Sequence, residues 1–249
     1  MKNKLTSAFL IIFIIFILSP MLLILVNSFK PFPFSIGQYF DLLSSSKGYF
    51  ILYTRSFMIA LLITIGQLIV SVVVGFCLGR FKFRGRLAFI IGYVMVFFLP
   101  YSATLLPNYM IIKAMGLLGT QASLVLPAIF SPAGVVIMTI FTAMLPMETF
   151  EAALLETKSI FSIIRHVLIP QLRPGIALTV IISFTEAWNM VEAPQALMED
   201  KLKHPLSLLL NDIFRADTSV NFAGSALYII PAMILLFIFS DILINKNNK

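Results

Sequence analysis

The chain has 249 residues, of which 59% are hydrophobic and only 12% are charged, and its mean hydropathy is +0.99. Soluble domains carry roughly a quarter charged residues, so this composition excludes an ordinary soluble protein and indicates an integral membrane protein. The net charge of +7 would also suit a nucleic-acid partner. In a membrane protein, however, Lys and Arg collect in cytoplasmic loops, and we therefore attribute the charge to membrane topology.

Six apolar stretches are long enough to cross a bilayer as helices. The first follows Lys2 and Lys4. It is longer than the apolar core of a signal peptide, and no small-residue cleavage site follows it, so we expect it to remain as a membrane anchor. We expect residues 1–249 to form a single all-helical transmembrane domain. The predicted spans are residues 5–28, 57–78, 87–106, 122–144, 175–194 and 222–244.

The basic residues indicate how these spans are oriented. Six spans place both termini on one side of the membrane, and eleven of the 18 Lys and Arg residues lie on that side. Four of the eleven lie in the loop 79–86, GRFKFRGR. Because positively charged loops stay on the cytoplasmic side, we expect both termini, this loop and residues 146–173 in the cytoplasm.

Residues 146–173 form a charged connection with helical character between the fourth and fifth predicted spans. Pro146 suits a first helical position, and the carboxylate of Glu148 would lie near the positive end of the helix dipole. Pro170 and Pro174 interrupt the helical pattern before the fifth span. A solvated connecting helix and a helix that binds a partner both fit this stretch. Its apolar face is Phe150, Leu154, Phe161, Ile164 and Leu168, and its polar face is Glu151, Lys158, Arg165 and Arg173.

The sequence predicts no catalytic residue, no cofactor site and no metal site. It lacks the phosphate-binding motif GxxxxGK[ST] and the hydrolase motifs GxSxG and HExxH. The single cysteine, Cys77, has no partner for a disulfide or a cysteine-based metal site, and His166 and His204 lie in separate loops. An enzyme is therefore the weaker interpretation.

The fifth predicted span carries unusual polar residues near its end. The segment 183–194, SFTEAWNMVEAP, contains Glu186, Trp188, Asn189 and Glu192. A carboxylate inside the bilayer is costly unless it faces water or a partner. On a continuous helix, Glu186 and Asn189 share one face, and Trp188 and Glu192 share an adjacent one. These side chains could line a solute pathway, or they could hold helices together within a bundle.

The stretch 151–170, EAALLETKSIFSIIRHVLIP, resembles the signature loop of permease subunits in binding-protein-dependent ABC importers. That loop contains EAA, two further residues, an acidic residue and Gly, and later Ile-x-Leu-Pro. Other fragments resemble the carbohydrate branch, in particular the smaller permease of maltose-like systems: SPMLLILVNSFK, GRFKFRGR, GLLGT and the WN pair at 188–189. The matching positions in the loop are Glu151, Ala152, Ala153, Glu156, Val167, Ile169 and Pro170.

The resemblance implies a six-span permease in a bacterial or archaeal cell membrane. The loop would form a cytoplasmic coupling helix between spans four and five that docks on a dimeric ATPase, and that ATPase would hold the ATP and Mg²⁺. Further partners would be a second, homologous permease chain and an extracytoplasmic solute-binding protein. The cargo would be a sugar or oligosaccharide. The coupling residues would be Glu151, Ala152, Ala153, Glu156, Thr157 and Pro170, and the pathway residues Glu186, Trp188, Asn189 and Glu192.

Several positions depart from the family pattern. The family glycine is Thr157 here, and because a β-branched residue does not readily adopt a positive φ, we expect the bend at this position to form without one. Arg55 replaces the family's Asn, and Met190 and Val191 follow the WN pair. These changes bear on the identity of the solute rather than on the transporter class. Another polar solute, or less favourably a secondary transporter, would also fit the sequence.

Overall fold

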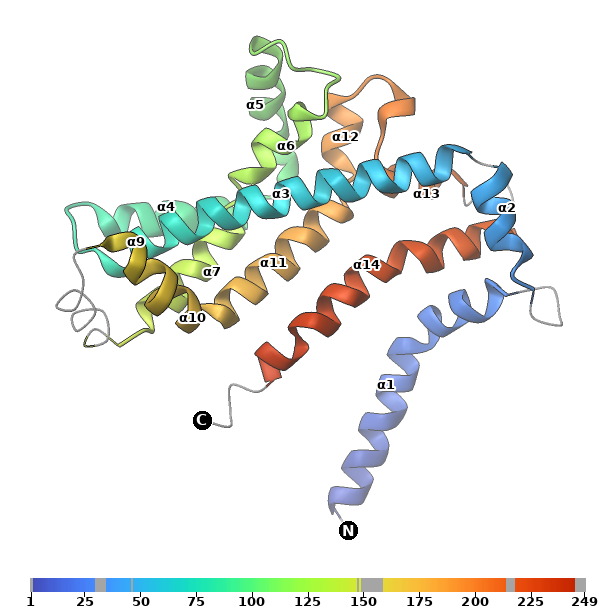
Figure 1. The fold of residues 1–249 in the computed structure, drawn as a ribbon, viewed down its shortest axis with the longest axis horizontal. Coiled ribbons are helices and arrows are strands. Elements are labelled where there is room, and N and C mark those ends of the chain that lie inside the picture. The colour runs from blue at the N-terminus through green and yellow to red at the C-terminus, as the bar shows by residue number, and fades with distance from the viewer. Residues whose placement is uncertain are drawn as a thin grey trace. The chain divides into compact units, whose positions relative to one another are not determined.

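The computed structural model of the chain describes residues 2–29, 35–45, 47–146, 148, 159–213 and 218–244. Within these ranges every regular element is a helix (Figure 1). The predicted all-helical class is therefore confirmed.

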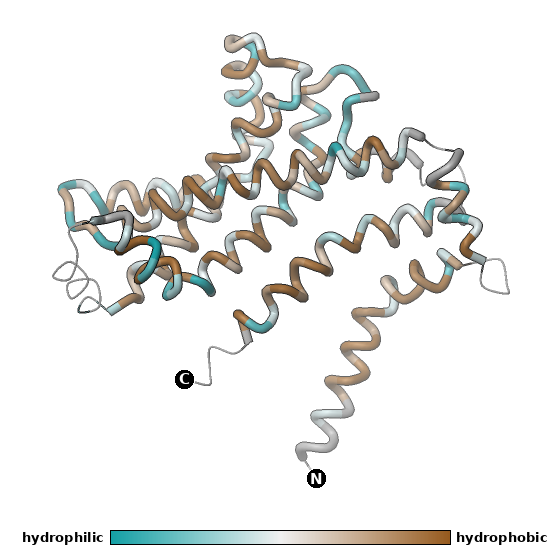
Figure 2. The backbone as a smooth tube through the Cα atoms, in the orientation of Figure 1, coloured by the Kyte–Doolittle hydropathy of each residue, from teal (hydrophilic) through white to brown (hydrophobic). Residues whose placement is uncertain are grey.

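Several helices are apolar along most of their length (Figure 2). By length and composition, four of them could each cross a bilayer: Phe9–Asn27, Gly48–Arg80, Ala122–Ala143 and Asn221–Leu243. Two further helix pairs qualify if each pair counts as one bent span, so the part of the chain that is described accommodates up to six spans. This is the architecture of a multi-pass membrane protein.

The third predicted span, residues 87–106, is divided into two helices. α4 (Arg86–Phe98) and α5 (Tyr101–Ala114) meet at an angle of 103° across a short break. A proline disfavours helical backbone in the residue before it, and Leu99, which precedes Pro100, has φ −69° and ψ 133°. The residues 87–106 therefore do not form one continuous helix.

The fifth predicted span ends earlier than residue 194, because α11 (Arg173–Trp188) stops at Asn189. The backbone N–H and the side-chain Nδ2 of Asn189 both donate to the carbonyl of Thr185, at 3.1 and 2.9 Å. After this break a separate short helix, α12 (Glu192–Leu197), begins. Trp188 and Glu192 consequently lie on different helices, and the predicted sharing of a helix face between them is wrong.

A second break precedes α11. The π-helical turn η1 (Ile164–Leu168) and the short α10 (Ile169–Gln171) are bent by 71° relative to α11. Pro170 lies inside α10 and Pro174 lies in the first turn of α11, where the missing N–H costs nothing. The predicted interruption is confirmed at Leu172, which lies between these two prolines.

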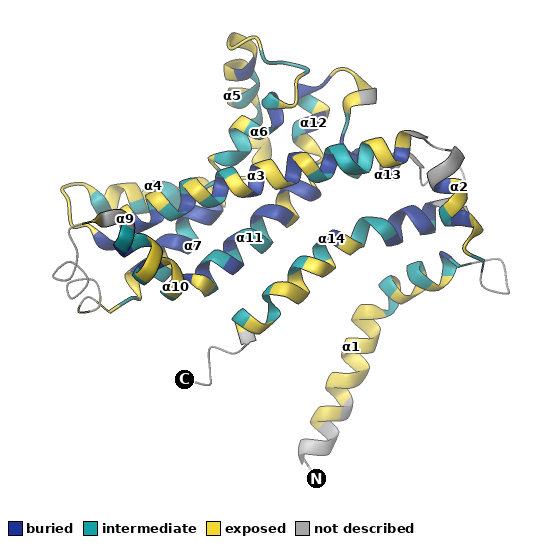
Figure 3. Cartoon of the chain, viewed as in Figure 1, coloured by how far each residue is buried: buried dark blue, intermediate teal, exposed yellow. Residues whose placement is uncertain are grey.

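The chain divides into two compact units, one within residues 1–54 and 206–231 and the other within 55–205 and 232–249. The first unit contains α1 (Lys2–Asn27), α2 (Gly37–Ser45), α13 (Leu206–Ile213) and the first turns of α3 (Lys47–Arg80) and α14 (Thr218–Ile244). The Tyr49 hydroxyl donates a 2.7 Å hydrogen bond to the carbonyl of Gly224. None of the most apolar window of α1 is buried within the chain (Figure 3). The core of this unit is Leu42, Tyr49, Leu206 and Leu210.

The second unit holds the rest of α3 and carries both predicted functional regions. Its remaining elements include α6 (Ala122–Ile129), α7 (Pro132–Ala143), α9 (Ile160–Ile163) and η2 (Lys201–Lys203). α7 packs against α4 and α11, and much of its surface is buried (Figure 3). α3 approaches α7 as closely as glycine permits: a Cβ atom on Gly75 would lie 2.5 Å from the Cβ of Met138. Small residues at such a crossing are how membrane helices achieve close packing.

Candidate functional site

Most of the predicted coupling residues, namely Glu151, Ala152, Ala153, Glu156 and Thr157, lie outside the described residues. The expected absence of a positive φ at Thr157 therefore stays a prediction, which a backbone φ measured at that residue would test. The structure does describe the chain on both sides of residues 149–158, and these flanks define how the segment is attached to the helices.

The entrance to the coupling segment is held by Arg80, the last residue of α3. Its Nη1 donates to the carbonyl oxygen of Leu145 at 3.0 Å, and its Nη2 donates to that of Pro146 at 2.8 Å. The side chain is only 8% exposed. A guanidinium presents several donors in one plane, so a single side chain can hold two successive carbonyls. Arg80 thereby ties the end of α3 to the turn that follows α7.

A second arginine secures the loop between α3 and α4. Arg86 donates from Nε to the carbonyl of Leu78 at 2.6 Å and from Nη2 to that of Gly79 at 3.1 Å. The last carbonyls of a helix have no partner within the helix, and a cation there both satisfies them and complements the helix dipole. Arg80 and Arg86 together fix the ends of α3, α4 and α7 to one another.

The exit from the coupling segment is held by apolar packing. Ile163 of α9, Leu168 of η1 and Leu172 are each 3% exposed or less. They form one core with Phe76 of α3 and Met138 of α7. Arg165 and Pro170, on the same stretch, are exposed. For the described residues, the predicted apolar and polar faces are therefore confirmed at Leu168 and Arg165.

These contacts attach both flanks of the predicted coupling segment to the long helices. Arg80 links residues 145 and 146 to α3, and the shared core links the residues after 159 to α3 and α7. Burial of such side chains stabilises by roughly 1.5–3 kcal/mol each, so the attachment at the exit is substantial. The arrangement suits a segment that transmits movement to the membrane helices.

The predicted pathway residues separate into two groups. Glu186 and Asn189 are exposed on the final turn of α11 and the residue after it, and Glu192 is exposed at the start of α12. The hydroxyl of Thr185, beside them, donates to the carbonyl of Ile181 at 2.7 Å. Polar side chains thus gather at the break between α11 and α12, where a solute could reach them.

Trp188 lies apart from this exposed group. It is 2% exposed, stacks on Phe184 with ring centroids 5.8 Å apart, and meets Phe57 of α3 edge-on at 6.3 Å. Aromatic pairs in these geometries contribute about 0.5–1.5 kcal/mol beyond their buried area. In this arrangement the indole packs α11 against α3.

The end of this unit beyond α11 is a small cluster of α5, α6 and α12, which lie side by side (Figure 1). The N–H of Gly119 donates to the carbonyl of Leu197 at 2.9 Å, which joins the loop before α6 to the end of α12. An imidazole nitrogen of His204 contacts the carbonyl of Met198 at 2.9 Å and closes the following loop. The His204 side chain thus contacts a backbone carbonyl and helps to hold this loop. Within the described residues, no group of three His, Cys, Asp or Glu side chains could hold a metal ion.

Three known permeases align with the chain over most of its length. The arabinooligosaccharide transport permease AraQ of Halalkalibacterium halodurans is 24% identical over 85% of this chain and 76% of its own. The diacetylchitobiose uptake permease DasC of Streptomyces coelicolor is 25% identical over 80% and 74%. The sn-glycerol-3-phosphate transport permease UgpE of Agrobacterium fabrum is 29% identical over 73% and 66%. No family model matches the chain.

A solved structure has the same fold. It is a chain of a bacterial ABC transporter involved in the import of the acidic polysaccharide alginate, and the TM-score is 0.80 over 99% of this chain and 96% of that chain, at 18% identity. The fold therefore agrees with the class to which the three relatives belong. This chain is therefore similar in sequence to transport permeases and has the fold of a chain of an ABC importer.

Sequence reasoning about this chain missed the attachment residues of the coupling segment. The charge pattern predicts only that Arg80 and Arg86 help to orient the chain, whereas in the structure each holds two backbone carbonyls. The close helix crossing was also missed. Its signal is the four-residue spacing of Gly75 and Gly79 in GFCLG, which is the small-xxx-small pattern of packed membrane helices.

Proposed function

We propose that this chain forms half of the translocation pathway for a sugar or oligosaccharide. Its partners are a second, homologous permease chain, a dimeric cytoplasmic ATPase that binds ATP and Mg²⁺, and an extracytoplasmic solute-binding protein. It resides in a bacterial or archaeal cell membrane with both termini in the cytoplasm. The observation that carries this proposal is the alignment with permeases of arabinooligosaccharide and diacetylchitobiose systems over at least 80% of the chain.

The coupling role rests on the two attachments of residues 146–173. Closure of the ATPase dimer would move the coupling residues Glu151, Ala152, Ala153, Glu156 and Thr157. Arg80 and the core around Leu168 would carry that movement to α3 and α7. Pro170 precedes the bend between α10 and α11, so no continuous helix joins the coupling segment to α11. The movement would therefore pass through the packed side chains.

The polar group at the break after α11 supports a neutral, hydroxyl-rich solute. Carboxylates and carboxamides accept and donate the hydrogen bonds that sugar hydroxyls need. Glu186 and Asn189 would contact the solute directly, with Glu192 nearby on α12. Trp188 would set the position of the helix end through its packing on Phe57.

A phosphorylated solute is the second candidate, since the relative UgpE belongs to an sn-glycerol-3-phosphate system. A phosphate group is normally bound by Arg, Lys or helix N-termini. The exposed residues at the break include two carboxylates, Glu186 and Glu192, which would repel it. The charge of these residues favours the saccharide.

Co-purification and uptake test the proposal. The chain is expressed with its neighbouring permease and ATPase, reconstituted in proteoliposomes, and supplied with the binding protein and radiolabelled oligosaccharides or glycerol-3-phosphate. We expect a stoichiometric ATPase and ATP-dependent uptake of an oligosaccharide. Uptake of glycerol-3-phosphate alone would support the second candidate, and uptake without an ATPase would contradict both.

A further inference from the structure

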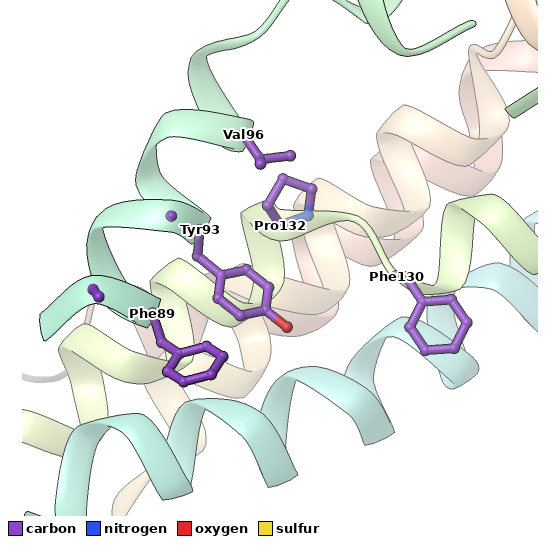
Figure 4. A pocket seen from close by; sticks show the side chains of 7 residues that line it. Phe89, Tyr93, Val96, Phe130 and Pro132 are labelled. Atoms are coloured by element: carbon purple, nitrogen blue, oxygen red, sulfur yellow. The ribbon is translucent and has the colours of Figure 1, made fainter. Parts of the chain in front are cut away.

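An open apolar groove runs along one side of α4 (Figure 4). Its volume is about 380 Å³. The side chain of Tyr93 is the one polar group among its lining residues, so the groove does not suit a sugar, which needs several hydrogen-bonding partners. The lining residues are Ala88, Phe89, Gly92, Tyr93, Val96, Phe130 and Pro132.

The groove begins next to the basic loop between α3 and α4. Its first lining residues, Ala88 and Phe89, lie in the first turn of α4, and the ring of Phe89 meets that of Phe83 in the loop at 6.1 Å. From Ala88 to Val96 the helix rises about 12 Å. The groove therefore extends from the predicted cytoplasmic edge of the membrane toward its interior.

Two of the four cations in the basic loop are exposed and are not among those that bond carbonyls at the helix ends. Arg80 and Arg86 are held on backbone carbonyls, whereas Lys82 and Arg84 are exposed. The sequence contains no Asp or Glu anywhere between Asp41 and Glu148, so neither α4 nor any helix that lines the groove supplies a counter-charge. A negatively charged partner is favoured at this end.

We propose that the groove and the loop form a binding site for an anionic phospholipid. The headgroup phosphate is held by Lys82 and Arg84, and an acyl chain lies along α4 in the groove. Clusters of basic residues at the cytoplasmic edge of membrane helices attract anionic headgroups. An acyl chain packed in the groove gains dispersion contacts with the protein for each methylene that it places there. A second protein chain would instead need carboxylates opposite the loop together with an apolar wedge.

Two kinds of variant test separately the binding of the lipid headgroup and the binding of the acyl chain. Lys82→Gln with Arg84→Gln removes both charges and leaves the groove unchanged. Gly92→Leu fills the groove, and the helix tolerates it because a Cβ at Gly92 would meet no other atom within 4 Å. Lys201→Gln with Lys203→Gln is the charge-matched control. Gly48→Leu is the matched control for the filled groove, because Gly48 is another helical glycine with open space around its Cβ.

The experiment measures lipid binding to the purified, detergent-solubilised transporter by native mass spectrometry and by thermal shift. Phosphatidylglycerol is compared with phosphatidylcholine. We expect phosphatidylglycerol to be retained preferentially, and roughly 30-fold weaker binding when both loop charges are removed. We expect Gly92→Leu to lose the retained lipid of either kind, while both controls behave as the wild type.

Three results would overturn the proposal. The first is equal retention of the two lipids by the wild type, and the second is retention unchanged in Gly92→Leu. The third is loss of the second permease from the complex in Gly92→Leu, since that would make the groove a protein interface. Lipid retention is measured without transport, so the lipid site and ATP-dependent uptake by the wild type are tested separately.

Discussion

The guanidinium of Arg80 lies 2.8 Å from the carbonyl oxygen of Pro146, and so joins the last residue of α3 to the start of the coupling segment. Its other terminal nitrogen holds the carbonyl of Leu145 at 3.0 Å. The two residues are far apart in the sequence. Arg80 therefore links the end of α3 to the start of the predicted coupling segment.

Arg80→Ala should lower uptake about tenfold or more while the ATPase still co-purifies. The substitution leaves two carbonyls without a charged donor, and each such hydrogen bond contributes about 1.5–3 kcal/mol. Arg80→Lys should recover only part of the activity, because an ammonium lacks the planar fork that holds both oxygens. The measurement is sugar uptake per ATP hydrolysed in proteoliposomes.

Arg84→Ala is the matched control for Arg80, since it removes an exposed arginine from the same loop. It should leave uptake per ATP unchanged. If Arg80→Ala gave the same uptake per ATP as Arg84→Ala and the wild type, the two hydrogen bonds of Arg80 would have no role in coupling.

Gly75→Ala should destabilise the permease by about 1–3 kcal/mol. The added Cβ would lie 2.5 Å from Met138 Cβ and 2.9 Å from the backbone of α7, which cannot move aside as a flexible side chain would. Gly92→Ala, at an open helical position, should be neutral or slightly stabilising. Thermal unfolding of the two purified variants provides the comparison, and equal melting temperatures would show that α3 and α7 do not cross this closely.

Trp188→Ala should cost about 3–5 kcal/mol of stability, because it removes a large buried side chain packed against Phe57 and Phe184. Trp188→Phe keeps an aromatic ring there and should restore stability and solute preference. A change in preference with Trp188→Phe, at unchanged stability, would instead mean that the indole contacts the solute.

Glu186→Ala combined with Asn189→Ala should reduce uptake or change solute preference, since both side chains are exposed at the break after α11. The complex should assemble normally, because neither residue belongs to a buried core cluster. Uptake of several labelled sugars by assembled complexes is the measurement. Unchanged uptake and preference would remove these residues from the pathway.

Much of the fold could be predicted because apolar length is a strong signal. The helices 47–80 and 218–244 contain the second and sixth predicted spans, and the helix 2–27 covers all of the first except Ser28. The break at Pro100 was missed, although a proline after Leu99 is a local signal, because average hydropathy stays high across it.

The candidate site was predictable only where residue type indicates environment. The carboxylate of Glu186 can be recognised in the sequence because it interrupts an apolar stretch. The burial of Trp188 cannot, because it depends on Phe57, which is far away in the sequence. The role of Arg80 depends on two carbonyls that any sequence could supply, so no residue pattern encodes it. The close crossing at Gly75 and Gly79 had a readable four-residue spacing.

The most direct test of the account is the driving force for uptake by the purified complex. Proteoliposomes containing this permease, its neighbouring permease and the co-purified ATPase are given labelled oligosaccharide and binding protein, with ATP or with a proton or sodium gradient. The account predicts uptake with ATP and none with either gradient alone. Gradient-driven uptake by this chain without an ATPase would contradict it.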